Sequence, residues 1–186
     1  MTSDQSELKF RCAAYHEAGH IVAAAVGGLK LKRERELVWI NSDGCGCSRY
    51  IGGPCLANAD RAWYDCHSKQ GIVSLHAGFI AQEQFHLDCP KNSATQDSRD
   101  IDCHLKGLFG SADSEEAVEK SEEWKREAEQ IVREHWYAIQ ELAEAICGQP
   151  CVTDDQHGLV KRLGWLQVQE VLEKCKIDAC WFGAMD

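Results

Sequence analysis

The fold is decided by one segment of the chain, Ala13-Ala14-Tyr15-His16-Glu17-Ala18-Gly19-His20-Ile21-Val22-Ala23-Ala24-Ala25-Val26. Its apolar residues recur with helical spacing and alanines fill most other positions, which is typical of a helix buried on nearly all sides. Three ionisable side chains interrupt this pattern, namely His16, Glu17 and His20. Because burying such groups is costly unless they are paired or bind a metal ion, the segment is a candidate functional site.

The spacing of the three side chains indicates a particular chemistry. His16 and His20 are four residues apart, so their imidazoles project from one helical face and can bind one zinc ion. Glu17 is rotated by about a quarter of a turn, so its carboxylate can reach a metal-bound water without being a ligand. In this H-E-x-x-H pattern zinc lowers the pKa of the water to about 7 and the glutamate acts as general base. A chance match is the alternative, but chance matches usually lie on solvated faces.

A catalytic zinc ion usually has three protein ligands, so one more is expected. The metzincin continuation is excluded because Ala23 and Val26 occupy the positions of its glycine and its last histidine. Glu34 and Glu36 are poor candidates because they lead into an expected strand at 37–40. The other candidates lie farther along the chain, at Asp97, Asp100, Asp102 and His104.

At these residues the chain resembles the peptidase domain of FtsH-type ATP-dependent zinc proteases. Residues 16–20 read HEAGH, which matches that family letter for letter, and residues 77–83 loosely follow a later family helix. The segment Ser98-Arg99-Asp100-Ile101 is similar to the end of the family segment whose aspartate is the third zinc ligand. The resemblance therefore implies Asp100 as third ligand. Asp97 is the first alternative, followed by Asp102 and His104, and each of these could instead cap or solvate a helix that runs to about Leu108.

The resemblance extends to residues 127–147 and 165–174. It implies a mainly α (α+β) fold, with a helical bundle around the HExxH helix and a small β-hairpin or sheet flanking the active-site cleft. A chain of 186 residues favours a single domain, 1–186. No G-x-x-x-x-G-K-[ST] phosphate loop is present. We therefore expect an ATP-independent zinc endopeptidase that hydrolyses peptides or unfolded segments.

The composition of the chain limits the classes of partner that we expect it to bind. The formal net charge of -10 disfavours nucleic acid. No apolar run is long enough for a membrane span, and residues 1–8 lack the plan of a signal peptide. The 11 cysteines are then expected to be mostly free, buried thiols in a reducing cytoplasm. A homo-oligomer and a partner protein are both left open.

Two other functions remain as alternatives. One is a catalytically inactive relative that serves as an adaptor or interaction domain. The other is a cysteine-based redox or metal sensor, for which Cys45 and Cys47, with Cys55, Cys66 and His67, would form a second metal cluster. Loop thiols without a ligand role are the simpler interpretation of these cysteines. Glu83, seven residues after His76, is either a surface residue or a group that orients a ligand imidazole.

The remaining elements follow from periodicity and turn residues. The pattern predicts two short strands within 37–51, joined by the turn residues 41–44. It predicts one long amphipathic helix from Asp113 to Ala145, ended by Gly148-Gln149-Pro150. Short helices are expected at 152–163 and at 165–174.

Overall fold

The computed structural model of the chain describes residues 3–51, 61–89 and 94–182. Its helices are α1 (Ser3–Val26), α2 (Arg61–Phe85), α3 (Ala94–Phe109), α4 (Glu115–Glu134), α5 (Trp136–Cys147) and α6 (Trp165–Lys174). Its strands are β1 (Lys30–Lys32), β2 (Val38–Asn41), β3 (Gly46–Ser48), β4 (Tyr50–Ile51), β5 (Val152–Asp154), β6 (Gly158–Leu163) and β7 (Cys180–Phe182). The expected mainly α (α+β) fold is confirmed.

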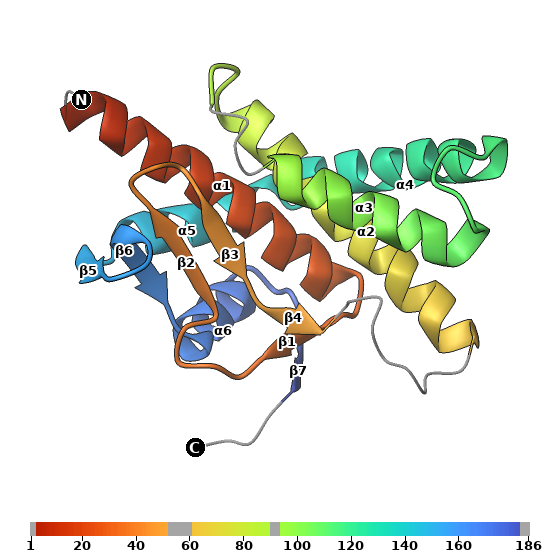
Figure 1. Cartoon of the computed structure of the whole chain (residues 1–186). Helices are drawn as coiled ribbons and strands as arrows, with labels where there is room; N and C mark the ends of the chain where they lie inside the picture. The colour runs from red at the N-terminus through yellow and green to blue at the C-terminus, as the bar shows by residue number, and fades with distance from the viewer. Residues whose placement is uncertain (1–2, 52–60, 90–93, 183–186) are drawn as a thin grey trace.

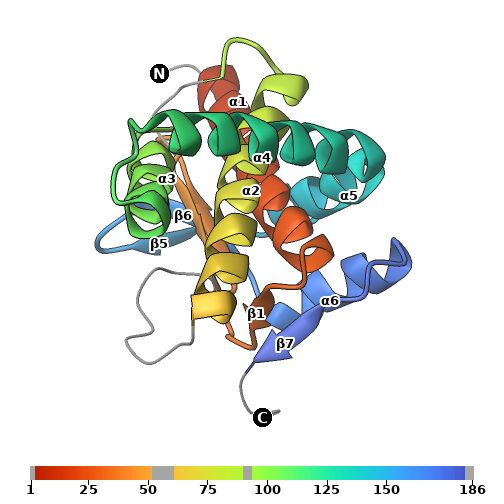
Figure 2. The ribbon, with the colours of Figure 1, turned by 90° about the vertical axis from the view of Figure 1, so that its right-hand side faces the viewer.

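Helix α1 runs through the middle of the molecule, with helices α2, α3 and α4 on one side and the larger sheet on the other (Figure 1). From Cys12 to Ala25 every one of its side chains is buried, as its alanine-rich sequence predicts. A Cβ added at Gly19 would lie 2.5 Å from the carbonyl oxygen of Ala77, so α1 and α2 cross more closely than an alanine would permit. Helix α4 and helix α3 cover α2 on its other sides (Figure 2). Among the described helices, none has both the length and the apolarity to cross a bilayer.

The larger sheet has the strand order β3-β2-β6-β5, and all its neighbouring strands are antiparallel. Its outer strand β3 lies against α1. The turn between β2 and β3 is held by the Asn41 side chain, whose Oδ1 accepts hydrogen bonds from the backbone N–H groups of Asp43 and Cys45. Gly44 supplies a positive φ of 86° in this turn. The predicted hairpin is therefore confirmed, and it lies beside the HExxH helix.

Two predicted helices differ from the structure. Residues 152–163 form β5 and β6 because β6 pairs with the distant strand β2, a contact that local periodicity cannot reveal. The long helix expected from Asp113 to Ala145 is divided at His135 into α4 and α5. Both pieces bury one apolar face, so the amphipathic pattern continues across the break. The helix expected at 165–174 is confirmed as α6.

The interface between α2 and α4 contains a histidine that we expect to make stability depend on pH. The ring of His76 is mostly buried, and its Nε2 has no hydrogen-bond partner in the described part of the chain. Burial, with a smaller effect from Lys125 on α4, lowers the pKa of His76 from 6.5 to about 4, although Glu122 opposes this shift. Between pH 6.5 and about pH 4, His76 is therefore neutral in the native state but protonated in the unfolded chain.

As the pH falls from 6.5 to about 4, the unfolded state gains a proton at His76 and the free energy of unfolding decreases. With allowance for the partial exposure of the ring, this loss is about 2 kcal/mol. His76→Phe keeps the ring shape and should remove this part of the pH dependence. Denaturant unfolding of both proteins between pH 7 and pH 4 measures the difference. Parallel stability curves would show that His76 does not titrate in this way.

Candidate metal centre

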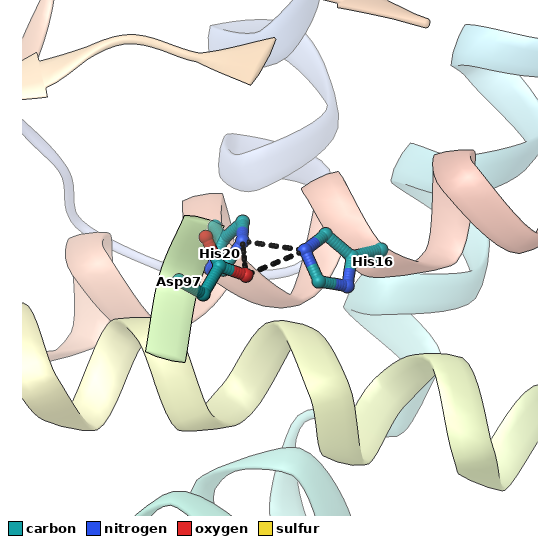
Figure 3. Close-up of side chains that lie close together, drawn as sticks. All are labelled: His16, His20 and Asp97. Carbon is teal, nitrogen blue, oxygen red and sulfur yellow. Dashed lines mark hydrogen bonds and ion pairs between the residues drawn. The ribbon is translucent and has the colours of Figure 1, made fainter. Parts of the chain in front are cut away.

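Three side chains converge where the first turn of α3 meets α1 (Figure 3). His16 and His20 come from α1, and Asp97 comes from α3. Asp97 Oδ2 lies 2.8 Å from His16 Nε2 and 3.3 Å from His20 Nε2. The two Nε2 atoms lie 2.9 Å apart. Two imidazole nitrogens and one carboxylate oxygen, all within 4.8 Å of one another, are a donor set suited to zinc.

The third member of this group is Asp97, and not Asp100 as the resemblance implied. Helix α3 begins at Ala94, so Asp97 lies in its first turn, where its carboxylate reaches both histidines. Asp100 instead accepts a hydrogen bond from Gln96 at 2.9 Å on the solvent side. Asp102 is exposed, and His104 is buried one to two turns farther along α3. The local match to Ser-Arg-Asp-Ile therefore lies on the helix that carries the group, but the aspartate beside the two histidines is Asp97.

Ser74 on α2 fixes the orientation of His20 through two buried hydrogen bonds. The Nδ1–H of His20 donates to the backbone carbonyl of Ser74 at 2.8 Å, and the Ser74 hydroxyl donates to the backbone carbonyl of His20 at 3.0 Å. Because a carbonyl can only accept, Nδ1 carries the proton, and the Nε2 of a neutral His20 presents a lone pair to Asp97. Such hydrogen bonding orients histidine ligands in known metal sites.

The negative charges of Asp97 and Glu17 favour a positive charge at the two histidines. Burial would lower the pKa of His20, but the neighbouring carboxylates of Asp97 and Glu17 raise it to about 9. Burial would raise the pKa of Asp97, but His20 and His16 hold it well below its usual range. Asp97 Oδ2 forms no well-directed hydrogen bond within the described residues, although two ring nitrogens lie close to it. A proton on His20 or a shared metal ion would supply the positive charge that these atoms require.

Glu17 lies beside the group and against strand β3. Its side chain is 3% exposed, and burial raises its pKa, although His20 and His16 oppose this. The Ser48 side chain hydrogen-bonds to it. A Cβ added at Gly46 would lie 2.6 Å from Glu17 Oε1, so the absence of a side chain at Gly46 leaves room for the carboxylate.

Gly78 on α2 provides the space for the ring of His20. A Cβ added at this position would lie 2.3 Å from His20 Cε1 and 2.7 Å from its Nε2. The sequence alone did not predict Ser74, Gly46 or Gly78 as site residues. Gly46 and Gly78 could have been noticed because glycine within a strand or a helix often marks a place where another group approaches the backbone closely.

The chain was compared with known proteins. No protein-family model matches it, and no curated protein does either. The likeness to FtsH-type peptidases therefore depends on the quoted residues alone.

Most of the described cysteines are free thiols, as expected, but the free ones are not buried. Cys12 and Cys89, both buried, form a disulfide, whereas the other described cysteines are exposed or half-buried. Cys45 and Cys47 are free thiols, and the only group with metal-ligand geometry in the described ranges is that of His16, His20 and Asp97. Cys55 lies outside the described residues. Glu83 is exposed, as its simpler interpretation predicted.

Proposed function

We propose that this chain is a zinc-dependent, ATP-independent endopeptidase. The observation that carries the proposal is the buried group of His16, His20 and Asp97 with Glu17 beside it. Two neutral imidazoles and one carboxylate are the three protein ligands that catalytic zinc sites usually have, and they would hold the ion here. Zinc held there would supply a Lewis acid that polarises a carbonyl and acidifies water.

Residues of the chain would hold the ion and transfer the proton during hydrolysis. His16, His20 and Asp97 would hold the ion, and Ser74 keeps His20 in the tautomer that leaves its Nε2 free. Glu17 would accept the proton of the attacking water and deliver it to the leaving amine. The raised pKa that burial gives Glu17 suits a group that must bind and release a proton near neutral pH.

A substrate would approach along β3. This strand is the outer member of its sheet, and its Gly46 contacts Glu17. An extended peptide can add to such an edge through main-chain hydrogen bonds. This arrangement favours peptides and unfolded segments as substrates. The net charge of -10 disfavours nucleic acid as a partner.

The metal site is tested by comparing Asp97→Ala with Asp100→Ala, two removals of a carboxylate three residues apart on α3. We expect wild-type protein to bind one zinc ion per chain. Asp97→Ala should weaken zinc binding by about 100-fold or more, because a ligand is lost, whereas Asp100→Ala should bind like wild type. Competition with a chromophoric chelator gives the affinities. Equal binding by both variants would contradict the assignment of Asp97.

A further inference from the structure

The register of the β2–β3 hairpin determines which backbone groups of β3 face the outer edge of the larger sheet. The backbone N–H of Asn41 donates to the carbonyl of Cys45 at 2.8 Å, so these residues form a hydrogen-bonded pair. In an antiparallel ladder such pairs alternate with pairs whose backbone groups point away from each other. The N–H and C=O groups of Gly46 and Ser48 therefore point toward the outer edge, where none of the described strands pairs with β3.

The side chains of β3 alternate between the two faces of the sheet. Gly46 faces Glu17, since a Cβ added at Gly46 would lie 2.6 Å from Glu17 Oε1. Cys47 lies on the opposite face, directly across from Trp39 on β2. A peptide strand added at the outer edge would continue this alternation. Every second side chain of the peptide would point toward Glu17, and the side chains between them would lie beside Cys47.

Trp39 gives this second face of the sheet an aromatic surface. Its neighbours Val38 and Ile40 are fully buried, whereas Trp39 is half-exposed. Neighbouring strands lie about 5 Å apart, so a bound peptide would lie about 10 Å from the backbone of β2. Cys47, between them, has a small side chain. A large side chain from the peptide could therefore extend over Cys47 and contact the indole of Trp39.

The aromatic surface is held in place before any peptide binds. The rings of Trp39 and His157 stack with their centroids 4.3 Å apart. His157 lies in the turn between β5 and β6, where Asp154 Oδ1 accepts hydrogen bonds from the backbone N–H groups of Gln156 and His157, both at 2.9 Å. Asp154 Oδ2 pairs with Arg162, which lies opposite Trp39 on β6. Contacts that are already ordered in this way reduce the entropic cost of binding.

We propose that Trp39 and Cys47 determine substrate specificity, by selecting peptides that carry a large apolar or aromatic side chain at the position beside Cys47. This inference rests on the proposed function, because it takes β3 as the edge that binds substrate. The selected side chain gains affinity by burying apolar area against the indole. Because the contact also fixes the peptide relative to Glu17, the cleaved bond lies at a constant number of residues from that side chain.

The first experiment measures peptide binding separately from catalysis. The protein is the Glu17→Gln chain with zinc present, and the probe is a fluorescent peptide of serine and threonine, with or without one phenylalanine. We expect the phenylalanine to tighten binding by about 5- to 20-fold, the gain that partial burial of an aromatic side chain gives. Trp39→Thr, added to the same chain, should remove most of this preference and leave binding of the serine–threonine peptide unchanged.

The matched control is Val152→Thr, the loss of an exposed apolar side chain from β5 at the opposite edge of the same sheet. It should keep the full preference for phenylalanine. Circular dichroism at the assay temperature establishes that each protein is folded. A preference that is absent from the parent chain, or that Trp39→Thr and Val152→Thr retain equally, would overturn the proposal.

A second measurement applies if Trp39→Thr does not fold. The phenylalanine peptide is titrated into the Glu17→Gln chain and the N–H signals are followed by NMR. We expect the backbone signals of Gly46 and Ser48 and the indole signal of Trp39 to shift together. The serine–threonine peptide should shift the two backbone signals more than the indole signal. An indole signal that the phenylalanine peptide leaves unchanged would overturn the proposal.

Mass spectrometry of the products formed by zinc-loaded wild type tests the register. Moving the phenylalanine by one residue should move the main cleavage by one residue, and in Trp39→Thr the cleavages should spread over several bonds. Cleavage positions in wild type that ignore the phenylalanine would overturn the inference and leave the proposed peptidase intact. If wild type cleaves no peptide while the Glu17→Gln chain selects phenylalanine through Trp39, the proposed peptidase is wrong and the binding preference stands.

Discussion

Replacing Glu17 by glutamine should abolish most peptidase activity while zinc binding persists. The substitution preserves the shape of the buried side chain and removes only its ability to accept a proton. Loss of a general base typically lowers kcat by about 10²- to 10⁴-fold. Because His16, His20 and Asp97 remain, zinc affinity should stay within a few-fold of the wild-type value. Hydrolysis of an unstructured, fluorescently quenched peptide, assayed beside a zinc titration, measures both quantities.

The matched control is Glu7→Gln, the same change at an exposed position on the same helix. It should retain wild-type activity. Equal activity of Glu17→Gln and wild type would exclude Glu17 as the base. If zinc-loaded wild type hydrolyses no peptide at all, the inactive adaptor becomes the better interpretation of the fold.

Replacing Gly78 by alanine should disrupt the metal site, although Gly78 is not itself a proposed ligand. The added Cβ would lie 2.3 Å from His20 Cε1, which no real contact tolerates, and it is fixed to the backbone of α2. The ring of His20 must therefore turn away, which breaks its hydrogen bond to Ser74 and removes Nε2 from the group. We expect zinc affinity to fall by about 100-fold, comparable with loss of a ligand or its support. The free energy of unfolding should fall by about 1–3 kcal/mol, as for other overpacked cores.

Gly148→Ala provides the control for this change. An added Cβ at the end of α5 meets its nearest neighbour, the carbonyl oxygen of Glu144, at 3.2 Å, so little must shift. Its zinc affinity should equal that of wild type. Wild-type zinc affinity in Gly78→Ala would show that His20 has room to move without leaving the site.

The HExxH helix could be predicted from the sequence because its evidence is local. Apolar periodicity, alanine content and the conflict with His16, Glu17 and His20 all lie within fourteen residues. The turn residues of the hairpin, among them Asn41 and Gly44, are local evidence in the same sense. Such signals do not depend on contacts with distant parts of the chain.

The features that the sequence did not reveal depend on distant contacts. Asp97 and Asp100 lie on the same helix, and only the way α3 packs on α2, beside α1, determines which carboxylate faces the histidines. The segment 152–163 forms strands because β2 offers it an edge from more than 100 residues away. The pairing of Cys12 with Cys89, 77 residues apart, is likewise a product of the crossing of α1 and α2.

Two of the three proposed ligands, His16 and His20, lie on the most deeply buried helix of the described structure, and this has a consequence for the lifetime of the protein. The fold brings His16, His20 and Asp97 together, so an ion held by all three binds the folded chain, and its occupancy and the folded state are thermodynamically linked. At a free zinc concentration of 100 times Kd, this linkage would stabilise the chain by about 2.7 kcal/mol. Zinc supply would thus govern how long each molecule survives heat and proteolysis, as well as how fast it works.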